Sequence, residues 1–340
     1  MTTHHPVLRK TLEAVVGAQR ALSLFEVLAI PQALLDETGP RISRAGIAQA
    51  LNMLLFEDLL DRVPNARLYA DDCLRDGRRI VHDHGAVRTI ALEGMGGLPA
   101  GEEAITRILR PLGYVLNGLY PLERLKMTGR SHAQAEFPEE LAQFFVSELH
   151  PERFSPEFQA AVQRVTATST DPLSPEAKSA LGELDTHRSL PVEAVIELLP
   201  VLVRCFSRQH QETTLADYEL LLSESPEMAW ISTEGTAFNH ATDRVPDVDQ
   251  LATDQKALGR PMKATVETSQ SRRVRQTAFL AARVPRNFRL PDGTTIEREV
   301  PGSFYEFITR LPNPEQDGKL DLSFDSSNAQ AIFKMTASTA

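Results

Sequence analysis

The sequence has few cysteines, a deficit of basic charge and no long apolar run. Cys73 and Cys205 are the only cysteines among 340 residues, so disulfides cannot stabilise the fold and a reducing compartment is expected. Lysine and arginine number 36 against 46 acidic residues, and the formal net charge of −10 argues against a broad nucleic-acid-binding face. No stretch approaches the roughly 18 apolar residues of a membrane span. We therefore expect a cytoplasmic protein without a nucleic-acid or membrane partner, and the sequence indicates no particular oligomeric state.

The common catalytic and phosphate-binding motifs are also missing. The sequence contains no G-x-G-x-x-G after a strand-like segment, no P-loop, no G-x-S-x-G and no H-E-x-x-H. The composition is otherwise ordinary, with 42% hydrophobic and 24% charged residues, which is typical of a globular protein of one to three domains. Any catalytic site must therefore be built from a less familiar set of residues.

Two parts of the chain repeat the same order of features. Each part opens with a short polar residue followed by histidine, with arginine four positions later: Asp83-His84 with Arg88, and Asn239-His240 with Arg244. Each continues through a helical pattern ending in Leu-Gly and then into strand-like segments. This repetition predicts an α+β fold with two β-α-β-β-β modules. The predicted regions are an N-terminal helical region at 1–79, a first module at 80–150, a helical insertion at 151–235 and a second module at 236–340.

The spacing of apolar residues predicts the elements within these regions. Residues 8–62 have the three- and four-residue spacing of helices. A hairpin turn is expected at Pro291-Asp292-Gly293, between two short strands. Further helices are expected at 102–113, 156–165, 175–184, 191–206, 214–225 and 248–259. Strands are expected at 82–92, 114–125, 141–149, 238–245, 261–269, 275–284, 287–290, 295–300 and 303–311.

The strand at 82–92 carries the first candidate site residues. Alternate residues of a strand share a face, so His82, His84, Ala86 and Arg88 are expected side by side. Such a face suits the floor of a pocket, with His84 binding a metal and Arg88 gripping a carboxylate through two hydrogen bonds. The alternative is a strand face exposed to solvent.

Two further residues complete a candidate metal site. His240 holds the place of His84 in the second module, so the two histidines can meet where the modules join. Glu306 shares a strand face with Phe304 and Ile308, and a carboxylate buried among apolar residues needs a metal or another cation. Two histidines and one carboxylate suit Fe(II), Zn²⁺ or Mn²⁺. His82 is a competing ligand, and His240 in a turn or Glu306 facing water are the structural alternatives.

These residues resemble the 2-oxoadipate dioxygenase/decarboxylase family, also called hydroxyglutarate synthase. The resemblance extends from about residue 50 to the C-terminus and rests on four segments in the same order: 83–89, 238–242, 302–307 and 326–333. It implies a vicinal-oxygen-chelate-like sheet or half-barrel made of the two modules, with added N-terminal and central helices. The chain differs from longer family members in its extra helical residues 1–49 and in a shorter segment after Glu306.

The resemblance also implies a function. It implies Fe(II) held by His84, His240 and Glu306, and a substrate bound by His84 and Arg88, with the backbone near Ser327 and Asn328 closing the pocket. Arg88 then acts in catalysis by holding the far carboxylate. The implied reaction converts 2-oxoadipate and O₂ to 2-hydroxyglutarate and CO₂, a step of lysine catabolism, and needs no second co-substrate.

Three other functions remain open on the sequence alone. The first is another metal enzyme on the same scaffold, such as a Zn²⁺ or Mn²⁺ isomerase or hydrolase. The second is a non-catalytic module that binds a 2-oxo acid. The third is a helical interaction protein whose histidines are structural and bind no metal.

Overall fold

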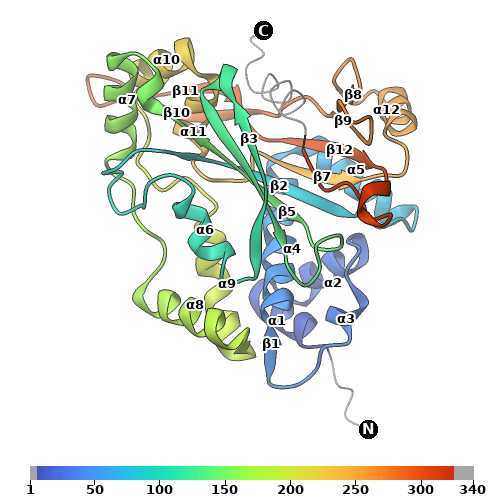
Figure 1. The fold of residues 1–340 in the computed structure, drawn as a ribbon. Coiled ribbons are helices and arrows are strands. Elements are labelled where there is room, and N and C mark those ends of the chain that lie inside the picture. The colour runs from blue at the N-terminus through green and yellow to red at the C-terminus, as the bar shows by residue number, and fades with distance from the viewer. Residues whose placement is uncertain (1–5, 325–340) are drawn as a thin grey trace.

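An eight-stranded mixed sheet forms the centre of the computed structural model, which describes residues 6–324 (Figure 1). The sheet curls into a half-barrel, and its strands lie in the order β3-β4-β5-β2-β7-β12-β9-β8. Their bounds are β2 His82–Ile90, β3 Tyr114–Leu122, β4 Met127–Gln134, β5 Gln143–Leu149, β7 His240–Arg244, β8 Glu267–Thr268, β9 Val274–Ala278 and β12 Phe304–Arg310.

The strand order is symmetric about the β2–β7 pair. Strands β2 and β7 are antiparallel to each other, and each has a parallel neighbour on its other side, β5 and β12 respectively. Helix α6 (Glu103–Leu109) connects β2 to β3, and helix α12 (Val248–Ala257) connects β7 to β8. The prediction of two β-α-β-β-β modules is therefore confirmed. The symmetry places the strands that carry His84 and His240 next to each other at the centre of the sheet.

Several element predictions were incomplete. Strand β4 was not predicted, because the polar sequence MTGRSHAQ has little apolar alternation. The expected hairpin around Pro291-Asp292-Gly293 is present, but its strands form a separate two-stranded sheet. They are β10 (Arg283–Arg289) and β11 (Thr295–Pro301). The strand predicted at 261–269 is reduced to the two residues of β8.

Three helices of the central region begin with the same Ser-Pro-Glu triplet. The serine side chain accepts a hydrogen bond from a backbone N–H of the first turn, proline takes the first helical position, and glutamate follows near the positive end of the helix dipole. These helices are α7 (Pro156–Thr166), α8 (Pro175–His187) and α11 (Pro226–Glu234). Helix α11 was not predicted, although its triplet at 225–227 is a helix-start signal in the sequence.

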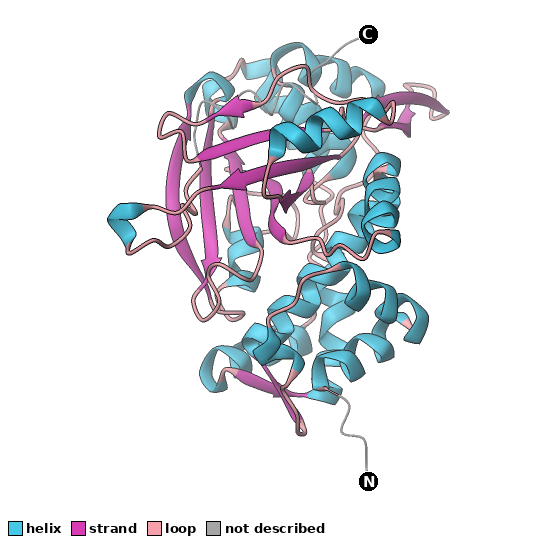
Figure 2. Ribbon diagram, turned by 90° about the vertical axis from the view of Figure 1, so that its right-hand side faces the viewer, coloured by secondary structure: helices cyan, strands magenta, loops and turns pink. Residues whose placement is uncertain are grey.

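Helices cover one face of the sheet, which we call the helix face (Figure 2). On this face Tyr305 of β12 packs against Phe56 of α4, with ring centroids 6.2 Å apart, and against Tyr69 of α5 at 5.8 Å. A small β1–β6 sheet joins the N-terminal helices to the central ones. The remaining elements are α1 Val7–Val16, α2 Ala18–Val27, α3 Gln32–Leu35, β1 Arg41–Ser43, α4 Arg44–Arg62, α5 Pro64–Arg75, β6 Ser189–Pro191, α9 Val192–Arg204, α10 Leu215–Glu224 and the short 3₁₀ helices Glu123–Leu125, Pro151–Arg153 and Pro314–Gln316.

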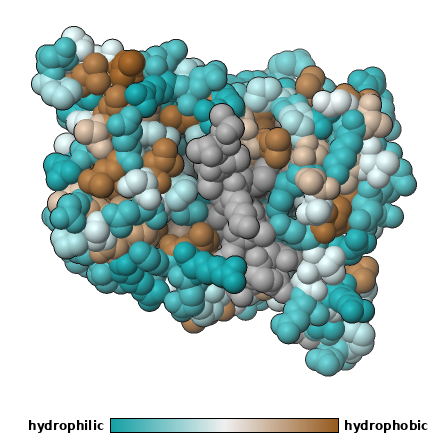
Figure 3. Space-filling view, turned by 90° about the horizontal axis from the view of Figure 1, so that it is seen from above, coloured by the Kyte–Doolittle hydropathy of each residue, from teal (hydrophilic) through white to brown (hydrophobic). Residues whose placement is uncertain are grey.

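The surface and the cysteines agree with the composition. Cys73 and Cys205 are both buried and unpaired. Within residues 6–324, no helix has both the length and the apolar character needed to cross a bilayer. The molecule seen from above is largely hydrophilic, with apolar side chains gathered in patches (Figure 3). Hydrophobic burial therefore supplies the main stabilisation of the fold.

Candidate metal centre

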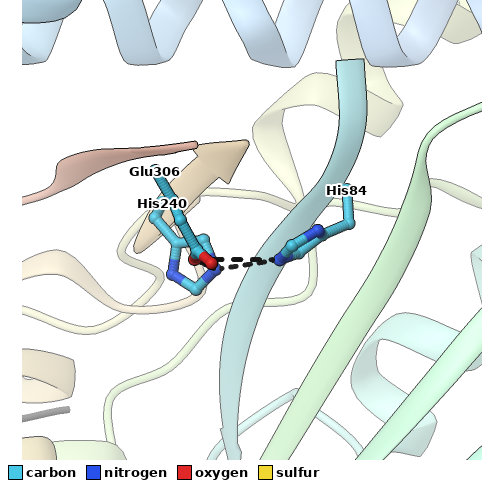
Figure 4. A group of neighbouring side chains, drawn as sticks. All are labelled: His84, His240 and Glu306. Carbon is cyan, nitrogen blue, oxygen red and sulfur yellow. Dashed lines mark hydrogen bonds and ion pairs between the residues drawn. The ribbon is translucent and has the colours of Figure 1, made fainter. Parts of the chain in front are cut away.

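His84, His240 and Glu306 meet on the face of the sheet opposite the helix face, which we call the site face (Figure 4). Each comes from a different strand of the central set β2, β7 and β12. One ligand atom from each residue lies within 4.8 Å of the others. The residues are 2%, 7% and 1% exposed, so the site is buried. The alternative in which Glu306 faces water is therefore wrong.

Strand register explains why these residues converge. Thr242 of β7 is the cross-strand partner of both His84 and Glu306, which places those two residues at one level on either side of β7. His240 lies two positions before Thr242 and so projects from the same face of β7. The juxtaposition thus depends on the pairing of the two modules.

The distances within the site fit a bound cation. His240 Nε2 lies 3.2 Å from Glu306 Oε2 and 3.3 Å from His84 Nε2. Both carboxylate oxygens of Glu306 are buried, and neither accepts a hydrogen bond from the residues that the structure describes. Burying such a group without a partner is costly, and a divalent cation between the three side chains would remove that cost. Two histidines and one carboxylate are a ligand set that suits a divalent metal such as Fe(II), Zn²⁺ or Mn²⁺.

Burial also sets the protonation of the ligands. It lowers the pKa of His84, and it lowers the pKa of His240 further with help from the charges of His84 and Arg88. Burial raises the pKa of Glu306 well above its ordinary value. The histidines are therefore neutral and able to donate a lone pair to a metal, while Glu306 must release a proton when a metal binds.

Each histidine is oriented by the residue before it. His84 Nδ1 is hydrogen-bonded to Asp83 Oδ1 at 2.8 Å, and His240 Nδ1 lies 3.1 Å from Asn239 Oδ1. Such contacts fix the ring so that Nε2 faces the metal position. Asp83 was not predicted as a site residue, although the repeated Asp/Asn-His pair in the sequence was the available signal.

His82 is not part of the site, and the prediction that it shares a face with His84 was wrong. The pairing of β2 with β7 shifts register between these two residues, so a bulge interrupts the alternation of faces. His82 instead packs on the helix face against Phe56 and Phe238, with ring centroids 5.3 and 6.3 Å apart. Burial lowers its pKa to about 3, so it is a neutral aromatic residue of the core.

Arg88 is fully buried on β2, four residues beyond His84. Its guanidinium lies 4.9 Å from the ring of Trp230 of α11, and burial lowers its pKa to about 10, where it is still charged at neutral pH. Ala86, which lies between the two residues, is paired with His240 across the β2–β7 ladder. A solvent-exposed strand face is therefore excluded, and a buried cation lies along the strand from the metal centre.

The C-terminal part of the described chain reaches the site. The Phe324 ring lies 4.7 Å from the ring of His84 and 4.9 Å from that of Phe145, measured between centroids. Gln143 donates a hydrogen bond of 3.3 Å to the carbonyl of Leu322. Phe324 was not predicted. The predicted substrate contacts at 327 and 328, Ser327 and Asn328, lie outside the described residues.

Comparison with known proteins identifies relatives over most of the chain. A model of the 2-oxoadipate dioxygenase/decarboxylase family matches residues 56–331. A crystal structure described as a glyoxalase superfamily protein from Ralstonia eutropha JMP134 is 55% identical, with a TM-score of 0.90, and the match covers 94% of this chain and 99% of that chain. The predicted vicinal-oxygen-chelate-like fold is thereby confirmed.

Two structures of hydroxyglutarate synthase in complex with 2-oxoadipate share the fold at lower identity. The enzyme from Oryza sativa is 20% identical with a TM-score of 0.67, over 92% of this chain and 95% of that chain. The enzyme from Pseudomonas putida is 19% identical with a TM-score of 0.60, over 88% of this chain and 74% of that chain. A search among curated proteins found no match.

Proposed function

Because this chain belongs to the 2-oxoadipate dioxygenase/decarboxylase family, we propose that it is an Fe(II)-dependent enzyme that converts 2-oxoadipate and O₂ to 2-hydroxyglutarate and CO₂. The observation that carries the proposal is the buried triad of His84, His240 and Glu306 with a buried arginine farther along the same strand. The reaction balances without a further co-substrate, since the six carbons of the substrate become the five-carbon hydroxy acid and CO₂.

His84, His240 and Glu306 would hold the iron. Fe(II) bound by two histidines and one carboxylate supplies the redox chemistry of O₂ activation and leaves positions open for a chelating 2-oxo acid. The protein keeps both histidines neutral by burial and aims their Nε2 atoms inward through the Asp83 and Asn239 contacts. These features prepare the site for a metal before the metal arrives.

Arg88 would bind the far carboxylate of the substrate. Four strand residues span about 13 Å between the Cα atoms of His84 and Arg88, so their side chains can contact opposite ends of a dicarboxylic acid several atoms long. A guanidinium presents two parallel N–H groups to a carboxylate, and burial strengthens the attraction. Trp230 packs on the guanidinium and restricts its movement. This arrangement would select dicarboxylic over monocarboxylic 2-oxo acids.

Aromatic side chains would keep water from the reacting groups. Phe304 stacks on His240 with centroids 4.8 Å apart, and Phe324 lies edge-on to His84. These rings surround the metal ligands with apolar surface on the site face. Excluding water strengthens the electrostatic contacts in the site and protects reactive groups from side reactions.

The proposal is tested by measuring O₂ uptake, CO₂ release and 2-hydroxyglutarate formation by Fe(II)-loaded protein. We expect the three quantities to be equal with 2-oxoadipate, and KM to be much higher with 2-oxohexanoate, which has the same chain length but lacks the far carboxylate. Turnover that requires Zn²⁺ or Mn²⁺ and consumes no O₂ would indicate a different metal enzyme. Binding of 2-oxoadipate without turnover would indicate a binding module.

A further inference from the structure

We propose that Asp83 and Arg310 form a positioning pair for the metal centre. Through this pair, the orientation of His84 depends on the position of residues 321–324, which we call the closing segment. The inference rests on the proposed function, because it assigns to this pair the task of coupling the metal ligand to the chain that covers the site.

The first half of the pair holds the metal ligand. Asp83 Oδ1 is hydrogen-bonded to His84 Nδ1 at 2.8 Å. Arg310 of β12 donates to both oxygens of the same carboxylate, from Nε at 3.1 and 2.9 Å and from Nη2 at 2.9 Å. The Asp83 and Arg310 side chains are 1% and 0% exposed. Because both charges are buried, each depends strongly on the other for its position.

The second half of the pair holds the closing segment. The remaining nitrogen of Arg310, Nη1, donates to the backbone carbonyls of Asp321 at 2.8 Å and Ser323 at 2.7 Å. A guanidinium is rigid and planar, so its three nitrogens cannot move independently. A shift of the closing segment would therefore tilt the plane that holds the Asp83 carboxylate.

The closing segment also contacts His84 directly. The Phe324 ring meets the ring of His84 edge-on at 4.7 Å, and the Phe324 N–H donates to the hydroxyl of Tyr120 at 3.1 Å. The Arg310 guanidinium carbon lies 5.0 Å from the centre of the Phe324 ring. The contacts thus form a closed circuit from His84 through the pair and the segment back to His84. In such a circuit, each contact supports the others.

Two cross-effects test the coupling. Among the described residues, Asp83 forms no hydrogen bond or ion pair with the closing segment, and Arg310 forms none with His84. A purely local role would therefore keep the effects of the two residues apart. We expect Arg310→Lys to raise the dissociation constant for Co²⁺, the metal probe, by about tenfold or more, the usual cost of disturbing a contact behind a ligand. We expect Asp83→Asn to increase hydrogen–deuterium exchange in a peptide covering 318–324.

Arg273→Met is the matched control. Arg273 Nε donates to the Asp321 carboxylate at 3.0 Å, so it holds the same segment from outside the pair. This variant should increase exchange in the segment and raise the Co²⁺ dissociation constant by less than Arg310→Lys does, because Arg310 keeps both of its partners. In the wild type, Co²⁺ should slow exchange in the segment, and Arg310→Lys should weaken that slowing.

A single variant could misfold because it leaves one buried charge without its partner. The double variant Asp83→Asn/Arg310→Met avoids this, since it removes both buried charges together. It should show both weaker Co²⁺ binding and faster exchange. The proposal would be overturned if Co²⁺ binding were unchanged in both Arg310→Lys and the double variant. It would also be overturned if exchange in the segment were unchanged in Asp83→Asn. Both readouts are independent of turnover. A protein that binds metal but leaves 2-oxoadipate unchanged would therefore refute the proposed function and still test the coupling.

Discussion

The three candidate ligands are the residues on which the account depends most, and Glu306 is the most informative of them. Its carboxylate is buried beside His84 and His240, and no described residue donates a hydrogen bond to it. A structural carboxylate would be expected to have such a donor. A bound cation would therefore explain why this carboxylate is buried. Replacing Glu306 can test metal binding separately from folding.

Glu306→Gln should abolish tight metal binding without unfolding the protein. The amide has nearly the same shape and no charge, so the metal-free protein should keep its stability. The dissociation constant for Fe(II) should rise by at least about 100-fold, since changes behind a ligand alone cost 10–100-fold. Anaerobic calorimetry measures this change. Glu267→Gln is the control, because Glu267 on β8 is a neighbouring carboxylate outside the triad; equal losses in both variants would contradict the assignment.

Arg88→Lys should raise KM for 2-oxoadipate by about tenfold, the equivalent of losing one charge-assisted hydrogen bond worth about 1.5 kcal/mol. Lysine keeps the charge but lacks the two parallel donors, and it loses the stacking on Trp230. KM for 2-oxohexanoate should change little, because that acid has no far carboxylate. Steady-state kinetics with both acids make the comparison, and an unchanged KM for 2-oxoadipate would remove Arg88 from the substrate site.

Asp243 gives the protein a pH dependence on the helix face. Burial raises its pKa to about 7, even though it accepts hydrogen bonds from the Tyr69 hydroxyl at 2.6 Å and the Val81 N–H at 2.9 Å. The native state thus keeps a proton that the unfolded chain, with an ordinary pKa near 3.8, has released. The contribution of Asp243 to stability is therefore present below that lower value and is lost as pH rises through about 7.

The Asp243→Asn variant isolates this effect from other titrating groups. Its free energy of unfolding should increase relative to that of the wild type as the pH rises from about 4 to above 7, because asparagine has no proton to lose. Urea denaturation of both proteins at several pH values measures the difference. A difference that does not change with pH would show that Asp243 titrates normally.

At the scale of elements, β2 carries His84, Asp83 and Arg88, and its packing tolerates little change. A Cβ atom added to Gly85 would lie 2.3 Å from the ring of Phe238, a buried aromatic residue that cannot move aside. Gly85→Ala should therefore lower the free energy of unfolding by about 1–3 kcal/mol or more. Gly182→Ala is the contrast: its added Cβ meets nothing within 4 Å on helix α8, so it should stabilise by about 0.5–1 kcal/mol. Thermal or urea unfolding of both variants measures these changes. A Gly85→Ala variant with an unchanged free energy of unfolding would contradict this packing.

The same elements show what could be predicted from the sequence. The inward direction of Glu306 followed from the period of two along β12, which is a local property. The position of His82 did not, because the bulge depends on pairing with β7 far along the chain. Arg310 could not be found either, since its partner Asp83 lies 227 residues away. Local pattern thus indicated the candidate ligands, while the residues hydrogen-bonded behind them are brought there by tertiary pairing.

At the scale of the molecule, the two modules build one site between them. His84 comes from the first module, while His240 and Glu306 come from the second, and the β2–β7 pair joins them. The doubled pattern in the sequence predicted that the two histidines can meet where the modules join, while Glu306 was added from the apolar face of its own strand. Helices α4 and α5 cover the helix face, while Trp230 of α11 packs on Arg88. The sequence signalled the start of α11 but not this contact, which depends on tertiary packing.

The central claim is that the triad binds Fe(II) and that a 2-oxo acid chelates that iron. The most direct measurement is an anaerobic titration of the Fe(II)-loaded protein with 2-oxoadipate, followed by visible absorption, since a chelated 2-oxo acid gives Fe(II) a charge-transfer band. We predict a band that saturates at one substrate per iron and is absent in His240→Ala. Tightly bound iron that gives no band, or a band that persists in His240→Ala, would contradict it.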